Sequence, residues 1–201
     1  RIKFGPDGFL YITTGDSQNP SLAQDKNSLA GKILRVTDEG KPAPGNPFAT
    51  QIYSFGHRNP QGLTWDDRNR LWATEHGAST LDEVNIIEKG KNYGWPEIAG
   101  GQTKEGMETP IINSGSATWA PSGSAYLNGS IFFAGLRGQA LFEYNIASKI
   151  LTPHLKGEIG RIREVVVGPD NLLYITTSNH DGRGIPGTTD DKIIRVNPNK
   201  L

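Results

Sequence analysis

The feature that most constrains the fold is an internal repeat. Residues 1–16 read RIKFGPDGFLYITTGD, and residues 163–178 read REVVVGPDNLLYITTS. In both segments an extended run meets Gly-Pro-Asp and then continues as Leu-Tyr-Ile-Thr-Thr. Proline presets the first central position of a turn, and Gly8 or Asn171 accepts the positive φ that follows. The repeat therefore predicts two copies of one antiparallel strand pair.

Two looser copies lie between these segments, at residues 60–77 and 123–146, and Asn128-Gly129 is a hairpin-turn pair. Further strands are predicted at 31–36, 82–90 and 191–198. Repeated units of short antiparallel strands favour an all-β fold of the β-propeller type. A sandwich would not explain why Gly-Pro-Asp recurs with the same flanks.

The extent of the domain follows from the number of units. We expect residues 1–201 to form a single partial β-propeller domain of about four blades, because so few units do not close a ring of this kind. The chain opens on Arg1, without a methionine, inside a strand pattern. We therefore expect the N-terminal blades to be missing from this sequence.

Composition narrows the partners. The chain has 21 Lys and Arg and 21 Asp and Glu, which gives a formal net charge of zero. Such a balance gives no support to binding of nucleic acid or of an anionic membrane surface. There is no cysteine, which excludes disulfides, and no apolar run approaches the roughly 20 residues of a membrane span. Any cluster of arginines must therefore be a local site.

Four arginines lie where units begin or where a strand ends. Arg58 lies in GHRNPQG beside Asn59, Arg137 follows an apolar strand, and Arg161 and Arg163 open the last unit. Alternate residues of an extended chain face the same side, so Arg161 and Arg163 should point together, with Ile162 turned away. Guanidinium groups bind carboxylates and phosphates in a bidentate manner. We expect a pocket for a ligand with several negative groups. The alternative is that these arginines pair with nearby acidic side chains at blade edges.

A second set of residues suggests a cation site. Asp82 and Glu83 are adjacent carboxylates before a predicted strand, and Tyr93 follows in KNYGWP. Carboxylate and carbonyl oxygens form the ligand shell that calcium prefers. The residues alone favour the simpler interpretation, in which Asp82 and Glu83 are charges that protect an exposed strand edge.

The histidines provide no catalytic pattern. None belongs to a recognisable Ser/Asp triad, and each is more often a hydrogen-bonded structural residue. By their neighbours, His57 and His76 have the best claim to a site. The four histidines are His57, His76, His154 and His180.

Several segments together resemble the soluble quinoprotein sugar dehydrogenases, the glucose/sorbosone dehydrogenase family. They are GHRNPQG, TEHG…DEVNII…GKNYGWP, LAQDKNSLAGKILRV, GRIREVVVGPDNLLYITTSNHDGRG and the terminal DDKIIRV. The resemblance covers nearly the whole chain in order. It implies a six-bladed β-propeller that uses pyrroloquinoline quinone (PQQ) and calcium to oxidise a sugar, often at the C1 hydroxyl of an aldose. It also implies an external electron acceptor and a periplasmic or secreted location.

The resemblance also implies roles for particular residues. Cofactor contacts would come from Arg58 and Asn59, from the Gly135, Leu136 and Arg137 loop, and from the Arg161, Ile162 and Arg163 segment. The family has a His-Gly-Pro turn whose carbonyls bind calcium. This chain has His-Gly-Ala, which assigns those carbonyls to Gly77 and Ala78. A second calcium would bind at Glu83 and Tyr93.

The implied general base is a histidine that would lie just upstream of Arg1. The chain alone is therefore expected to be inactive. Two alternatives stay open: a non-enzymatic propeller that only binds a ligand, and a metal-dependent six-bladed lactonase. The pairing of Arg161 with Arg163 and of Arg58 with Asn59 argues against the first. The second lacks a convincing set of metal ligands in the sequence.

Overall fold

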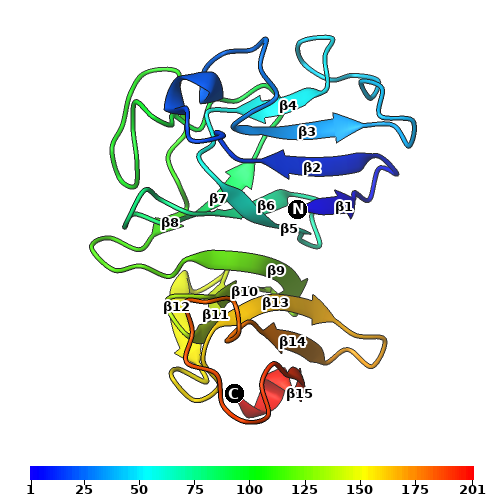
Figure 1. Ribbon diagram of the computed structural model, residues 1–201. Coiled ribbons are helices and arrows are strands. Elements are labelled where there is room, and N and C mark those ends of the chain that lie inside the picture. The colour runs from blue at the N-terminus through cyan, green and yellow to red at the C-terminus, as the bar shows by residue number, and fades with distance from the viewer.

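The computed structural model describes residues 1–201 and shows an all-β chain. Four antiparallel sheets follow one another along the sequence, three with four strands and the last with three. Figure 1 shows the sheets succeeding one another from the blue N-terminal strands to the red C-terminus. The prediction of about four units of antiparallel strands is confirmed.

Each sheet is built from strands that are consecutive in sequence. The first sheet holds β1 (Ile2–Phe4), β2 (Leu10–Thr14), β3 (Lys32–Val36) and β4 (Ile52–Phe55), and the second holds β5 (Pro60–Trp65), β6 (Leu71–Glu75), β7 (Glu83–Ile87) and β8 (Ile112–Asn113). The third holds β9 (Pro121–Leu127), β10 (Ser130–Gly135), β11 (Ala140–Asn145) and β12 (Ile150–His154), and the fourth holds β13 (Ile162–Val167), β14 (Leu173–Thr177) and β15 (Ile193–Val196). Two short 3-10 helices are η1 (Pro20–Ala23) and η2 (Pro198–Lys200).

The first strands of the second, third and fourth sheets lie next to one another. Strand β9 contacts β5 on one side and β13 on the other, and β2 contacts β5. This is the arrangement of a propeller, in which the first strand of each blade lines the central channel. The structure adds the outer strands β4, β8 and β12, which were not predicted.

The repeated turn has a structural reason. In the first and last blades, the turn aspartate accepts a hydrogen bond of 3.0 Å from a tyrosine hydroxyl and one of 2.8 Å from an arginine Nε. The aspartate, tyrosine and arginine are Asp7, Tyr11 and Arg35 in the first blade and Asp170, Tyr174 and Arg195 in the last. One carboxylate thereby links three strands of a blade, because the tyrosine and arginine come from the second and third strands.

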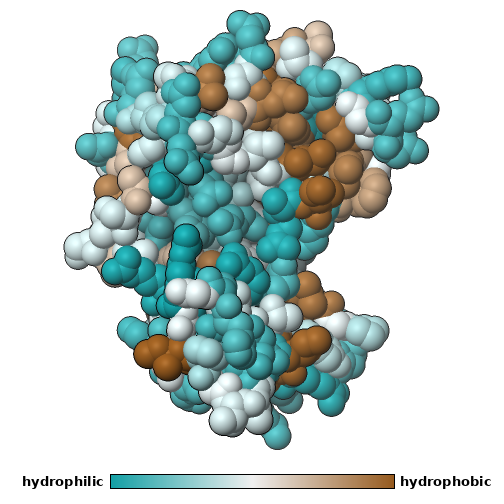
Figure 2. All heavy atoms as spheres, viewed as in Figure 1, coloured by the Kyte–Doolittle hydropathy of each residue, from teal (hydrophilic) through white to brown (hydrophobic).

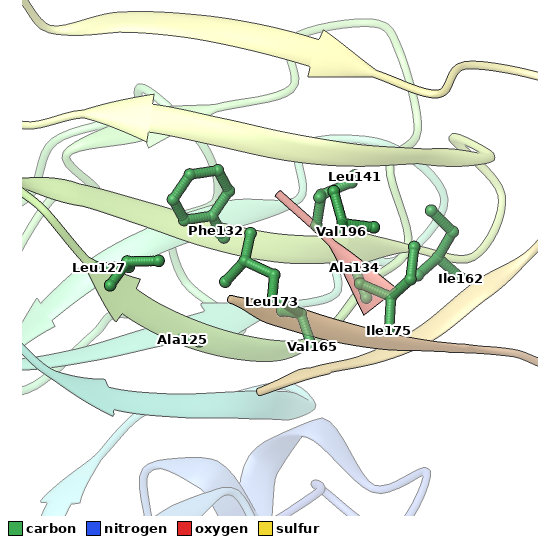
Figure 3. Packing of buried hydrophobic residues seen from close by; sticks show 10 residues of the cluster. All are labelled: Ala125, Leu127, Phe132, Ala134, Leu141, Ile162, Val165, Leu173, Ile175 and Val196. Carbon is green, nitrogen blue, oxygen red and sulfur yellow. The ribbon is translucent and has the colours of Figure 1, made fainter. Parts of the chain in front are cut away.

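The hydrophobic core lies between blades. The largest cluster joins the third and fourth sheets, and Figure 3 shows its side chains meeting across the gap between them. Ile162 belongs to this cluster and is fully buried, so its side chain is turned away from its charged neighbours, as strand alternation predicts. Two further clusters join the second sheet to the third and the first to the second.

Large apolar side chains remain exposed on the first and last sheets. Ile2 and Phe4 of β1 are 66% and 62% exposed, and Ile193 of β15 is 78% exposed. Figure 2 shows apolar residues in brown near the right of this face, among hydrophilic residues in teal. No helix is long and apolar enough to cross a membrane. The extent of the domain beyond these sheets stays a prediction.

Candidate functional site

A cavity of about 410 Å³ lies where loops from three blades meet. Its walls come from the β4–β5 link, the β6–β7 loop, the segment before β9, the β10–β11 turn, the start of β13 and the β14–β15 loop. All these connections lie at one end of the blades, opposite the Gly-Pro-Asp turns. Residues far apart in the sequence are thereby brought to a common cavity.

Most of the predicted site residues line this cavity. They are Arg58 and Asn59, Gly77 and Ala78, Leu136 and Arg137, and Arg161. Three other predicted contacts do not line it, and these are Gly135, Ile162 and Arg163. Gly135 is buried in β10, where a Cβ would lie 2.5 Å from a ring atom of Phe142. Glycine at this position therefore serves packing.

Arg163 lies beside the cavity. Its Nη1 donates to Oε1 of Gln61 at 3.4 Å, and its Nη2 lies 3.7 Å from Oδ2 of Asp181. Both Arg161 and Arg163 thus turn to the same aspartate, which agrees with the expectation that they point together. Only Arg161 reaches the wall of the cavity.

Arg161 is buried and already neutralised. Its Nε and Nη2 donate to Oδ2 of Asp181 at 3.1 and 2.8 Å. Its backbone N–H donates to Oδ1 of Asn179 at 2.8 Å. The hydrogen bond from Arg161 lowers the pKa of Asp181 below its ordinary value, so the Asp181 carboxyl stays ionised at neutral pH. Arg161 is therefore a fixed donor with its charge balanced by a neighbour.

The other arginines of the cavity have no carboxylate partner. Arg58, Arg137 and Arg183 form no ion pair. Arg58 lies over the ring of Trp95, at 5.7 Å from its centroid, and donates from Nη1 to the carbonyl of His76 at 3.4 Å. The cavity therefore presents three guanidinium groups that are not engaged in an ion pair.

Asp82 is the one acidic residue in the wall, and its oxygens are occupied. Its Oδ1 accepts from the N–H of Gly77 at 2.9 Å, and its Oδ2 accepts from the N–H groups of Trp119 and Ala120 at 2.6 and 2.8 Å. With an exposure of 1%, Asp82 is not a strand-edge charge. That interpretation was wrong, because the carboxylate serves as an internal acceptor that links the second blade to the third.

A buried chain of side chains supports Arg58 and Asn59 from behind. Oε1 of Glu75 accepts from the backbone N–H of Arg58, and from that of Asn59 at 3.3 Å. Oε2 of Glu75 lies 2.9 Å from Nδ1 of His57, whose Nε2 lies 2.9 Å from Oγ of Ser54. Ser54 and His57 are fully buried, so no substrate reaches the hydroxyl despite the triad-like order. His57 is therefore structural.

Glu83 and Tyr93 line a separate cavity of about 10 Å³ together with Glu75. Burial and the nearby Glu75 carboxylate raise the pKa of Glu83 to about 7. Glu83 accepts from Gly100 N at 2.7 Å and from Asn85 Nδ2 at 3.1 Å. Tyr93 directs its hydroxyl to the carbonyl of Ile86 at 2.6 Å. Any Tyr93 ligand atom would thus be its backbone carbonyl.

His76 connects the two cavities. It lines both, and its Nε2 is buried without a hydrogen-bond partner. Burial lowers the pKa of His76, which favours the neutral ring. An unpaired buried nitrogen at a cavity wall is a position that a polar ligand can satisfy.

Sequence reasoning did not identify two charged residues as part of the cavity wall. Asp82 was considered only as an edge charge or a cation ligand, and Arg183 received no role. The signal for Arg183 is the Gly-Arg-Gly run at residues 182–184, because glycines on both sides allow a tight loop around the arginine.

Fold and site together define a β-propeller whose blade loops enclose an arginine-lined cavity. The model of the glucose/sorbosone dehydrogenase family matches residues 1–194, and the chain belongs to this family. The resemblance noted in the sequence is thereby confirmed.

Related proteins agree with this assignment. Aldose sugar dehydrogenase YliI of Escherichia coli K12 is 33% identical over 213 residues, which cover 90% of this chain and 57% of the relative. The PQQ-bound aldose sugar dehydrogenase of Streptomyces coelicolor is similar with a TM-score of 0.93 and 48% identity, over 98% of this chain and 60% of that one. The structure of a Thermus thermophilus protein described as an oxidoreductase (glucose dehydrogenase) is similar with a TM-score of 0.92 and 45% identity, over 98% of this chain and 64% of that one. This chain thus spans 57% to 64% of these relatives.

Proposed function

We propose that this chain forms much of the cofactor pocket of a quinoprotein sugar dehydrogenase, with PQQ in the arginine-lined cavity. The observation that carries the proposal is the set of three unpaired arginines, Arg58, Arg137 and Arg183, which reach one cavity from different blades. PQQ carries three carboxylates, and guanidinium groups bind carboxylates through paired hydrogen bonds. The charge of the cavity and the charge of the cofactor are therefore complementary.

The residues present fit this group in two further respects. A volume of about 410 Å³ lies in the range of ordinary cofactor sites. The unpartnered Nε2 of His76 offers an acceptor or donor beside the arginines of the wall. Asn59 adds an amide, and Leu136 adds an apolar surface.

The chain's own groups would bind and orient the cofactor. Arg58 and Asn59 are fixed through Glu75, and Arg161 is fixed through Asp181, so these donors are preorganised. Arg137 would add a contact from the β10–β11 turn, and Arg163 would add one from β13. When bound, PQQ would accept the hydride that leaves the hydroxyl-bearing carbon of an aldose. The arginine guanidiniums of the wall would stabilise the negative charge that the hydride acceptor gains.

Removal of the sugar hydroxyl proton needs a general base. We place this base, a histidine, outside residues 1–201, and propose that the chain alone does not oxidise sugar. Electrons would pass to an external acceptor in the periplasm or outside the cell. Membership of the family favours this activity over a lactonase.

Calcium is proposed at two places. The carbonyls of Gly77 and Ala78 would hold one ion at the wall of the main cavity. Glu83 and the carbonyl of Tyr93 would hold a second ion in the small cavity. The raised pKa of Glu83 supports the second site, since a cation beside buried carboxylates would offset their charge.

The test is titration of the chain with PQQ, followed by tryptophan fluorescence and by quinone absorption, with calcium or with a chelator. We expect one PQQ per chain and tighter binding with calcium. Absence of binding in both conditions would favour a propeller of the same family that has lost its cofactor. Binding of equal strength with and without calcium would contradict the first calcium site.

A further inference from the structure

Arg183 lies on the loop that joins β14 to β15. The residue lines the arginine-lined cavity on one side and a second polar cavity of about 450 Å³ on the other. Its side chain is exposed and has no ion pair. It therefore forms part of the wall between the two cavities, with a free guanidinium.

The same aspartate that neutralises Arg161 also fixes the position of Arg183. Oδ1 of Asp181 accepts from the backbone N–H of Arg183 at 3.0 Å, while Oδ2 accepts from Arg161. A single carboxylate thus fixes the backbone of Arg183 and the side chain of Arg161. Asp181 forms ion pairs with Arg161 and Arg163, whereas the guanidinium of Arg183 forms none.

The loop lies directly against Arg161. A Cβ on Gly184 would lie 2.9 Å from Cδ of Arg161 and 2.5 Å from the carbonyl oxygen of Asn179, so only glycine fits there. On the other side, Gly182 has a φ of 80°, a conformation that favours glycine. Arg183 thus lies between two glycines at the edge of the cavity, close to Arg161, which Asp181 already fixes.

We propose that Arg183 is a further cofactor-binding residue, which pairs with one carboxylate of the anionic quinone from the open side of the cavity. This inference rests on the proposed function. Arg161 is balanced by Asp181, so Arg58, Arg137 and Arg183 supply the three free charges that a tricarboxylate requires. The side chain gives up no ion pair when it turns to the ligand, which keeps the cost of this contact low.

The chain offers a matched control in Arg68. This arginine is also exposed, also lacks an ion pair, and also has its N–H bound at 3.0 Å by an aspartate two residues earlier, Asp66. It lies in the β5–β6 turn, at the opposite end of the blades. R68A therefore removes an equivalent side chain that cannot reach the cavity.

The experiment compares the dissociation constants of PQQ for the unchanged chain, R183A, R183K and R68A at several sodium chloride concentrations. We expect R183A to weaken binding about tenfold, since a charge-assisted pair is lost. Its dissociation constant should also depend less on salt, because one charge contact has gone. The dissociation constant of R183K should lie between those of the unchanged chain and R183A, and that of R68A should equal that of the unchanged chain. The trimethyl ester of PQQ should bind the unchanged chain and R183A equally.

Each result is decisive. Equal PQQ binding by R183A and R68A would overturn the role of Arg183 while leaving the proposed function intact. Failure of the unchanged chain to bind PQQ would overturn the proposed function and this inference with it. Thermal unfolding checks that each variant is folded. If R183A is not folded, R183K decides, and binding equal to that of the unchanged chain at every salt concentration overturns the proposal.

Discussion

Nδ1 of His57 lies 2.9 Å from Oε2 of Glu75, and both side chains are buried. The other oxygen of Glu75 accepts the backbone N–H groups of Arg58 and Asn59. The conformation of a turn at the cavity wall is therefore set by a carboxylate that does not itself reach the main cavity. Replacement of Glu75 should affect both the stability of the fold and the cavity.

We expect E75Q to lower the free energy of unfolding by about 1–3 kcal/mol, because an amide replaces a charged acceptor of three donors. PQQ binding should weaken as well, since Arg58 and Asn59 lose their fixed position. Urea unfolding and PQQ titration measure the two effects. E105Q changes an exposed glutamate and serves as the control. A variant as stable as E105Q would show that the hydrogen bonds to Glu75 contribute little.

The repeat made the fold predictable because the same local contacts recur. Asp7 and Asp170 occupy the same place in the repeat, and each binds a tyrosine four residues later and an arginine on the third strand. The residues that form these hydrogen bonds recur at the same spacing, so the repeated turn could be predicted from the sequence. Three of the cavity's four arginines, Arg58, Arg137 and Arg161, were also predictable, because loops at equivalent positions of blades converge.

What could not be predicted depends on long-range contacts. Asp82 accepts from Trp119 and Ala120, residues of the next blade, and no local pattern announces a carboxylate that will be enclosed by backbone amides. The choice between Arg163 and Arg183 as a wall residue depends on the path of the β14–β15 loop. Sequence spacing within a strand identifies side chains that share a face, but it does not place a loop above them.

Asp82 gives a second prediction. In D82N an amide group replaces one of the two oxygens, and an N–H donor then faces backbone donors. We expect a loss of roughly 2–3 kcal/mol in the free energy of unfolding. Circular dichroism during urea unfolding measures it, with D67N, at an exposed aspartate, as the control. A loss no greater than that of D67N would mean that the asparagine amide takes the place of the carboxylate at little cost.

The ion pair of Asp181 with Arg161 predicts a pH dependence. The hydrogen bond from Arg161 holds the pKa of Asp181 below 3.8, so the unfolded chain binds a proton more readily than the folded chain as pH falls. The stabilisation is complete above pH 3.8 and is lost as pH falls through the folded-state pKa. D181N should therefore be less stable than the unchanged chain at pH 7, and the difference should shrink below pH 3.8. Denaturant unfolding from neutral pH down to strongly acidic pH measures it, and a constant difference would contradict the ion pair's contribution.

The buried carboxylates beside Tyr93 predict a response to calcium. Glu83 and Glu75 line one small cavity, and an ion bound there only in the folded state raises the melting temperature. We expect calcium to raise the melting temperature of the chelator-treated chain, and E83Q to abolish most of that rise. Y93F should keep the response, because the Tyr93 hydroxyl is directed to the carbonyl of Ile86 and only the backbone carbonyl is available to an ion. Differential scanning fluorimetry with calcium, magnesium and chelator makes the comparison. An equal calcium response in E83Q and in the exposed-site variant E105Q would place the bound ion elsewhere, whereas loss of the response in Y93F would require the hydroxyl to turn toward Glu83.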